Sequence, residues 1–192
     1  MRGMIVAVLL AAGSARRFGS QKLLATLPDG RRVVETAAQM LAPTVARVFA
    51  VTAADDELAR VLRSCGCEVV VNHRAADGMG TSIAAGVGAS AAARGWLIAL
   101  GDMPYIQRQT IAKLTQSLRS PDDIVIPTFQ GRHGHPVLFG SAYRKELADL
   151  AGDRGARRIV DRHPASVYLV PVADAGILAD IDTPADLETP PH

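Results

Sequence analysis

A segment of small and basic residues follows the first apolar run of the chain. It reads Leu10-Ala11-Ala12-Gly13-Ser14-Ala15-Arg16-Arg17-Phe18-Gly19-Ser20-Gln21-Lys22. Small side chains let a ligand approach the backbone N–H groups, and Arg17 and Lys22 add positive charge, so the segment predicts a polyphosphate-binding loop. The spacing of Gly13, Gly19 and Lys22 matches neither a Walker loop nor a dinucleotide-binding loop. An ordinary strand-to-helix turn with solvated basic side chains is the alternative.

Two acidic segments could bind a metal ion. Asp102 follows the apolar run 96–100, in Gly101-Asp102-Met103-Pro104. Mg²⁺ prefers one or two carboxylates together with substrate phosphates and waters, so a carboxylate at the end of a buried strand is well placed to hold it. Asp182, in Asp180-Ile181-Asp182-Thr183-Pro184-Ala185-Asp186, is a candidate second ligand. Both residues could instead cap the helices that follow them.

Strand-like and helix-like patterns alternate along the chain and would position these loops. The continuous apolar run 4–10 is typical of a strand buried on both faces, and it explains these residues better than a secretion signal, because Arg16 and Arg17 follow at once. Further strands are expected at 48–51, 69–71, 96–100, 124–126 and 167–172, and helices at 33–41, 55–64, 81–94, 107–118, 142–150, 156–161 and from Thr183. The run 136–139 is expected to lie antiparallel. The alternation predicts a mainly parallel sheet in an α/β fold.

Composition excludes several classes of protein. The chain has 192 residues, of which 48% are apolar and 21% charged, so a disordered or coiled-coil chain is excluded. A formal net charge of +2 and 4% aromatic residues argue against a dedicated nucleic-acid binder. Cys65 and Cys67 cannot form a structural zinc site alone and are expected to be reduced. No apolar run approaches the ~18 residues of a membrane span, and we expect a cytoplasmic protein.

The motifs in their order resemble the MobA-like nucleotidyltransferase family, and most closely its molybdenum cofactor cytidylyltransferases. The resemblance extends over nearly the whole chain. It is carried by the first loop, by Gly101–Pro104, by Gly134-His135-Pro136 and by the closing Asp180–Leu187. Ala15 and Phe18 depart from the residues common in the family. The resemblance implies one nucleotidyltransferase domain over residues 1–192, with a three-layer, Rossmann-like sheet of the nucleotide-diphospho-sugar transferase type.

The resemblance also implies a reaction and a set of site residues. It implies transfer of CMP from CTP to the terminal phosphate of molybdopterin, with Mg²⁺ as cofactor and release of pyrophosphate. Arg17, Lys22 and Asp102 would be catalytic, and Asp102 and Asp182 would hold the metal. The nucleotide would be bound by Leu10, Ala11, Ala12, Gly13, Lys22, Gly80 and Ser82, and the pterin by Gly134, His135 and Pro136. CTP is favoured because Ala12 resembles the cytidine-using branch and its methyl would crowd a purine.

Three other functions remain open at this stage. The first keeps the reaction class, as guanylyl transfer to the same pterin or cytidylyl transfer to a sugar or polyol phosphate. The second is a carrier that delivers the cofactor to a molybdenum hydroxylase without turnover. The third is a nicotinamide-binding oxidoreductase, which the absence of G-x-G-x-x-G after the first strand disfavours.

Overall fold

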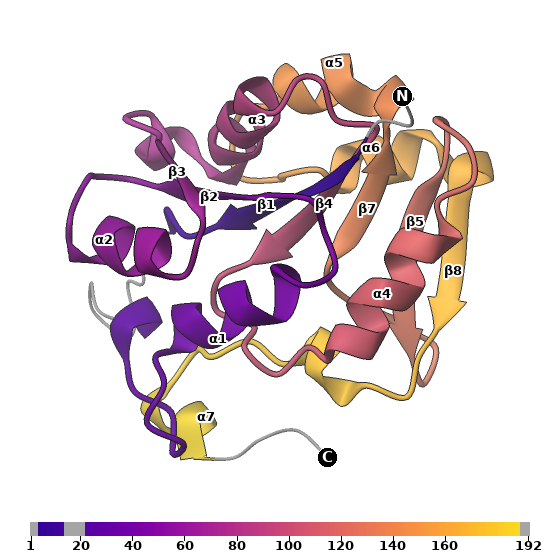
Figure 1. Cartoon of the computed structure of the whole chain (residues 1–192). Helices are drawn as coiled ribbons and strands as arrows, with labels where there is room; N and C mark the ends of the chain where they lie inside the picture. Colours follow the sequence, from indigo (N-terminus) through magenta and orange to yellow (C-terminus); the bar gives the residue numbers. More distant parts are fainter. Residues whose placement is uncertain (1–3, 14–21, 189–192) are drawn as a thin grey trace.

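A central sheet organises the computed structural model, which describes residues 4–13 and 22–188 (Figure 1). Within these residues the sheet has eight strands in the order β3-β2-β1-β4-β7-β5-β6, and β8 also pairs with β5. The strands are β1 (Ile5–Leu10), β2 (Val48–Thr52), β3 (Glu68–Val71), β4 (Gly95–Leu100), β5 (Ile124–Phe129), β6 (Arg132–His133), β7 (Val137–Gly140) and β8 (Val167–Pro171). The first four are mutually parallel, and β7 is antiparallel to β4 and β5. The expected mainly parallel α/β fold is confirmed.

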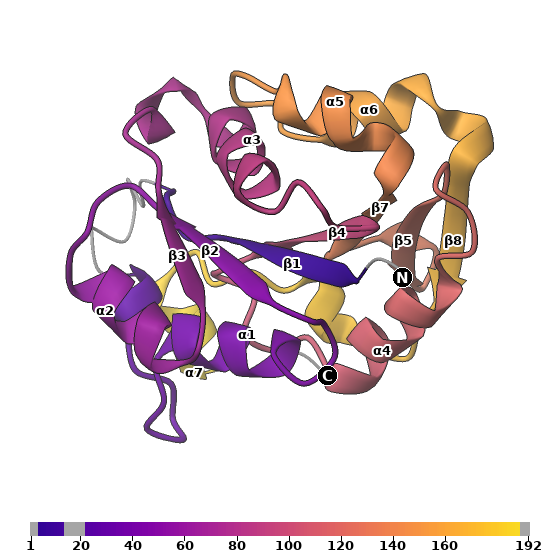
Figure 2. The same ribbon diagram turned by 45° about the horizontal axis from the view of Figure 1, so that its top comes forward.

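Helices cover both faces of the sheet and complete a three-layer arrangement (Figure 2). The helices are α1 (Val33–Leu41), α2 (Glu57–Ser64), α3 (Met79–Ala89), α4 (Arg108–Ser117), α5 (Arg144–Ala148), α6 (Arg157–Arg162) and α7 (Pro184–Glu188). Helices α3, α5 and α6 lie on one face, and α1, α2 and α4 lie on the other. No helix of the described residues is long and apolar enough to span a membrane.

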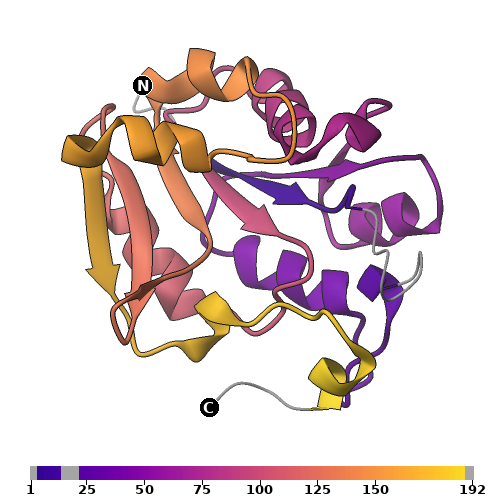
Figure 3. The same cartoon turned by 180° about the vertical axis from the view of Figure 1, so that it is seen from behind.

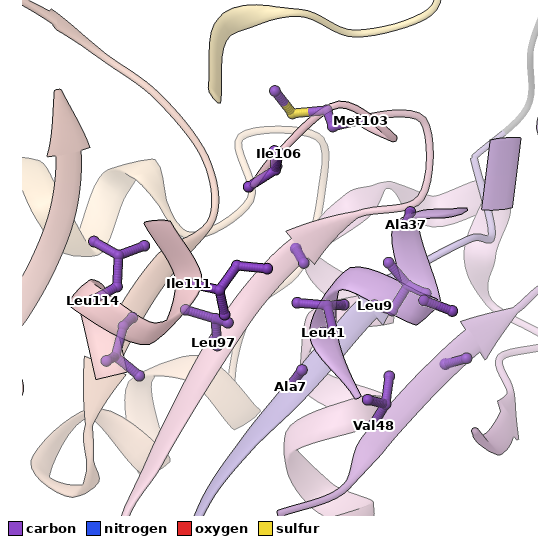
Figure 4. Close-up of a cluster of buried hydrophobic side chains, with 14 of the residues drawn as sticks. Ala7, Leu9, Ala37, Leu41, Val48, Leu97, Met103, Ile106, Ile111 and Leu114 are labelled. Atoms are coloured by element: carbon purple, nitrogen blue, oxygen red, sulfur yellow. The ribbon is translucent and has the colours of Figure 1, made fainter. Parts of the chain in front are cut away.

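Two apolar layers hold the helices against the sheet. In the layer below α1 and α4, Ala7 and Leu97 of the central strands contact Leu41 and Ile111 (Figure 4). The other layer contains Trp96, whose buried indole Nε1–H donates to the Ser90 Oγ at 3.0 Å. Alternate residues of β1 and β4 therefore enter opposite layers, which explains why these strands are continuous apolar runs.

The observed boundaries depart most from the expected ones at α3 and at the β5–β6 hairpin. Helix α3 covers 79–89 instead of 81–94: it begins after Gly78, whose φ is 110°, and ends where the Ser90 hydroxyl donates to the Gly86 carbonyl at 2.7 Å. The second departure is the β5–β6 hairpin, because the sequence indicated only a polar turn at 131–134. Pairing of Thr128 with His133 makes this turn a short ladder.

One buried carboxylate connects α4 to the C-terminal part of the chain. Asp174 is 2% exposed and follows β8. It accepts hydrogen bonds from the Thr110 hydroxyl at 2.6 Å, from the Gln107 N–H at 2.9 Å and from the Gly176 N–H at 3.0 Å. Because Gln107 ends the loop that carries Asp102, this carboxylate also fixes one end of that loop.

We predict that Asp174→Ala lowers the free energy of unfolding by about 2–4 kcal/mol, because two buried donors and one partly buried donor lose their acceptor. Urea denaturation followed by circular dichroism would measure the change. Asp149→Ala, which removes an exposed carboxylate of the chain, is the matched control and should shift stability by less than about 0.5 kcal/mol. An unchanged unfolding midpoint in the Asp174 variant would contradict the prediction.

Candidate active site

The carboxyl ends of β1 and β4 lie side by side and begin the site. Leu10 is paired with Leu100, and the Gly101 N–H donates to the Leu10 carbonyl at 2.9 Å. A Cβ at position 101 would lie 3.0 Å from that same carbonyl oxygen, so a glycine avoids a tight contact between the two strand ends. Ligands of open α/β sheets bind beyond the carboxyl ends of the strands, where the loops diverge.

Apolar anchors fix the loop that carries Asp102. Met103 and Ile106 are 4% and 5% exposed and insert into the layer below α1 and α4 (Figure 4). Asp102 precedes the first anchor, and its side chain remains 27% exposed. The loop therefore buries its apolar residues and presents a carboxylate at the sheet edge.

The C-terminal segment passes along the same edge towards α7 (Figure 3). The Ile181 N–H donates to the Asp102 carbonyl at 2.9 Å, and the Ile181 side chain is buried against Leu27 and Val33. Asp180 and Asp182, on either side of Ile181, are exposed. Carboxylate oxygens of Asp102, Asp180 and Asp182 lie within 4.8 Å of one another.

Lys22 completes this cluster. Its Nζ lies 2.9 Å from Asp182 Oδ1 and 3.0 Å from Asp102 Oδ2. Burial lowers the pKa of Lys22, but the hydrogen bonds to Asp182 and Asp102 and the charges of these carboxylates together raise that pKa above its usual value. The group is therefore an ammonium ion at neutral pH, and it offsets part of the negative charge of the carboxylates.

Asp180 was not among the metal ligands expected from the sequence, which named Asp102 and Asp182. In the structure a carboxylate oxygen of Asp180 lies in the same cluster, so Asp180 is a third candidate ligand beside them. Burial raises the pKa of Asp180, and the negative charges of Asp182 and Asp102 raise it further. The sequence pattern could have indicated Asp180. In an extended segment the residues on either side of a buried isoleucine point to the same side, so Asp180 is expected beside Asp182.

The donor set fits a hard divalent cation. Three carboxylates supply only oxygen ligands, which Mg²⁺ and Mn²⁺ prefer over nitrogen or sulfur. Asp102, Asp180 and Asp182 are the residues that would hold such an ion. Two of them are bound to Lys22 in this structure, so a cation would have to displace the ammonium group.

The Gly134-His135-Pro136 segment lies near the acidic cluster. The His135 N–H donates to the Ile177 carbonyl at 2.9 Å, and a Cβ at Gly134 would lie 2.4 Å from that carbonyl oxygen. Burial lowers the pKa of His135, while the charges of Asp102 and Asp180 oppose this shift. Its buried Nδ1 has no hydrogen-bond partner among the described residues.

The expected nucleotide-binding residues form a second group at the same edge. Leu10 and Ala11 are buried, Ala12 is half-buried and Gly13 is exposed, with open space where its Cβ would lie. The Gly80 N–H is bonded to the Gly152 carbonyl at 2.9 Å, so this donor is not available to a nucleotide here. Ser82 is buried in the first turn of α3. Arg17 lies outside the described residues.

Comparison with known proteins identifies the class of this enzyme. The sequence profile of the MobA-like NTP transferase domain matches residues 7–167. The chain therefore belongs to this family and is a nucleotidyltransferase.

Curated relatives align over almost the whole chain. Nicotine blue oxidoreductase from Paenarthrobacter nicotinovorans is 32% identical, and the match covers 93% of this chain and 92% of that protein. The probable molybdenum cofactor guanylyltransferase of Mycobacterium tuberculosis is 28% identical over 97% and 92% of the two chains. These relatives differ in the reactions that their names state.

Solved structures agree with the fold. A nucleotidyl transferase from Methanothermobacter is similar at a TM-score of 0.81, with 22% identity over 95% of this chain and 94% of that chain. Rv0371c from Mycobacterium tuberculosis is similar at a TM-score of 0.77, with 25% identity over 97% and 96% of the two chains. The nucleotide-diphospho-sugar transferase-like fold expected from the sequence is confirmed.

We predict that Lys22→Met increases the affinity for Mn²⁺ in the absence of nucleotide by about tenfold. The Lys22 ammonium group and the carboxylates attract each other by up to about 4 kcal/mol near a protein surface, and in the variant Mn²⁺ no longer has to displace that group. Titration followed by electron paramagnetic resonance would measure free Mn²⁺. Lys145→Met, on an exposed lysine paired only with Asp149 among the described residues, is the control. Weaker or equal Mn²⁺ binding by the Lys22 variant would contradict the prediction.

Proposed function

We propose that this protein transfers CMP from CTP to the terminal phosphate of molybdopterin, with Mg²⁺ as cofactor and release of pyrophosphate. The observation that carries the proposal is the contact of Lys22 with Asp102 and Asp182 beside the ends of β1 and β4. An ammonium group among carboxylates offers partners for both components of a metal–triphosphate complex. The relative named molybdenum cofactor guanylyltransferase supports the choice of the pterin as acceptor.

The chemistry needs no protein nucleophile. An oxygen of the pterin phosphate attacks the α-phosphorus of the triphosphate, the bond to the bridging oxygen breaks, and pyrophosphate leaves with that electron pair. Both reactants are anions, so positioning and charge neutralisation provide the catalysis. Lys22 and Arg17 would donate to phosphate oxygens. Mg²⁺, held by Asp102, Asp180 and Asp182, would supply further positive charge to the reacting phosphates.

The acceptor would bind beside the acidic cluster. His135 is held by its backbone bond to Ile177, and its neutral imidazole offers a hydrogen-bonding atom without a partner among the described residues. A neutral group at this position can bind the polar edge of a pterin without adding charge. Gly134 and Pro136 would shape the same surface. In this proposal residues 1–192 act as one nucleotidyltransferase domain.

The preference for CTP rests on Ala12. Its half-buried side chain packs against the apolar layer that contains Leu10 and Ile83. We expect its methyl to limit the space for a base beside the first loop. A pyrimidine is smaller than a purine and would meet less steric conflict there. GTP as the donor, or a sugar or polyol phosphate as the acceptor, would keep the same reaction class.

The relative named nicotine blue oxidoreductase favours one candidate of a different class. That relative is 32% identical along nearly the whole chain. Because its name states an oxidoreductase, binding of a reduced nicotinamide to this protein should be tested. Against it, the loop after β1 has Ala11 and Ala12 where a dinucleotide-binding loop carries its first glycines. A cofactor carrier for a molybdenum hydroxylase would bind the pterin but release no pyrophosphate.

We predict that the protein releases pyrophosphate when molybdopterin, CTP and Mg²⁺ are present together, and that Asp102→Asn reduces the rate at least about 100-fold, because a cation ligand and a charge are lost. A coupled pyrophosphate assay would measure the rate, with GTP, UTP and ATP tested in parallel. Thermal unfolding should show that the variant keeps its fold.

Matched variants and substrates separate the alternatives. Asp77→Asn, on an exposed carboxylate paired with Arg74, should leave the rate unchanged. Faster turnover with GTP would overturn the CTP assignment alone. Pterin binding without turnover for any nucleotide would favour the carrier, and NADH or NADPH oxidation without pyrophosphate release would favour the oxidoreductase.

A further inference from the structure

A buried polar cluster lies at the carboxyl edge of the sheet, on the side of α3. Asn72 directly follows β3, and Thr81 and Ser82 are in the first turn of α3. These three residues are 7%, 7% and 4% exposed. Buried polar groups are normally fully hydrogen-bonded, so the partners of each atom can be counted.

The Asn72 amide has one defined orientation. Its oxygen accepts from the Arg74 N–H at 3.0 Å, which directs the NH₂ group towards α3. The nitrogen donates to the Thr81 hydroxyl at 2.9 Å and to the Ser82 hydroxyl at 3.0 Å. Both amide hydrogens are thus used, and both hydroxyl oxygens act as acceptors.

The two hydroxyl groups differ in where their own hydrogens go. The Thr81 hydroxyl has two carbonyl acceptors, those of Gly78 and Arg74, each at 2.9 Å. No described residue accepts a hydrogen bond from the Ser82 hydroxyl. Asn72 already donates to the Ser82 oxygen, so the hydroxyl hydrogen of Ser82 remains for a ligand. The ligand atom that it meets must be a hydrogen-bond acceptor.

The position of Ser82 places this donor near the first loop. Gly86 lies one turn further along the same face of α3, and a Cβ there would lie 2.4 Å from a Val8 methyl of β1. Because α3 begins shortly after the end of β3, its N-terminus lies at the carboxyl edge of the sheet. Ser82 therefore lies beyond Gly86 towards that edge, next to the end of β1, where Ala12 packs in the same apolar layer as Ile83.

We propose that Asn72 is a positioning residue that holds the Ser82 hydroxyl as a hydrogen-bond donor to a carbonyl oxygen of the nucleotide base. This inference rests on the proposed function, which puts a nucleotide at the first loop. Cytosine, uracil and guanine carry a carbonyl oxygen, whereas adenine has none. Because the side chain of Ser82 is only 4% exposed, the base would reach it with its edge.

The test compares ligands that share some parts and lack others. Isothermal titration in the presence of Mg²⁺ would give dissociation constants for CTP, for ATP, and for inorganic triphosphate, which has no base or ribose. Ser82→Ala removes the donor. Asn72→Leu keeps roughly the size of the side chain, adds no charge and removes the donor that orients the Ser82 hydroxyl.

Each variant should weaken CTP binding roughly tenfold and leave ATP and inorganic triphosphate unchanged. The double variant should lose no more than either single variant, because both act on one hydrogen bond. Ser90→Ala is the matched control: its buried hydroxyl bonds Trp96 and Gly86 at the other end of α3, so it should lower thermal stability without changing the ligand preference.

Three results would overturn the inference. Equal losses for CTP and ATP would place the hydroxyl at the ribose, and losses for all three ligands would indicate a general disturbance of the site. Unchanged CTP binding in Ser82→Ala would make the cluster purely structural. Failure of the wild-type protein to bind any nucleotide would refute the proposed function itself, and this is seen before any variant is made.

Discussion

The contact of one ammonium group with two carboxylates balances the charge at this edge of the sheet. Asp102, Asp180 and Asp182 would repel one another if no cation were present. Lys22 lies between two of them, at 2.9 and 3.0 Å, and it is itself 9% exposed. Such an ion pair combines partial burial with short hydrogen bonds, and these are the conditions under which the attraction is strongest.

Backbone hydrogen bonds hold the segments that supply these charges. The Gly101 N–H bonds the end of β1, the Ile181 N–H bonds the Asp102 carbonyl, and the His135 N–H bonds Ile177. In two of the segments an apolar neighbour, Met103 or Ile181, is buried next to the acidic residue. Segments distant in sequence therefore meet through main-chain contacts, and the ion pair of Lys22 with Asp102 and Asp182 offsets part of the negative charge that these contacts bring together.

The parts of the fold with a repeating apolar pattern could be predicted from the sequence. Strands β1 and β4 and helix α1 were predicted to within one residue because burial selects their side chains at regular spacing. The hairpin strand β6 was missed because Arg132 and His133 are exposed and polar, and its pairing depends on the turn at Gln130 and Gly131, both with positive φ.

The site also contains residues that could be predicted from the sequence and one that could not. Asp102, Asp182 and Lys22 stand in motifs whose residue types indicate chemistry, and the structure brings them together. Asn72 is a single polar residue after a short strand, and nothing in its sequence neighbourhood distinguishes it. Its hydrogen bonds arise only when β3 and α3 pack together, so tertiary structure was needed to find it.

The loop after α5 packs closely against the N-terminus of α3. Helix N-termini often attract phosphate groups, but here the Gly152 carbonyl occupies the Gly80 N–H, and Gly78 and Gly80 leave no space for more than this backbone. The positive end of α3 is thus neutralised from within the chain. If the proposed function holds, the triphosphate of the nucleotide would have its charge partner at Lys22, and its uncharged base would face α3. The distribution of charge along this edge would thereby set the direction in which the nucleotide lies.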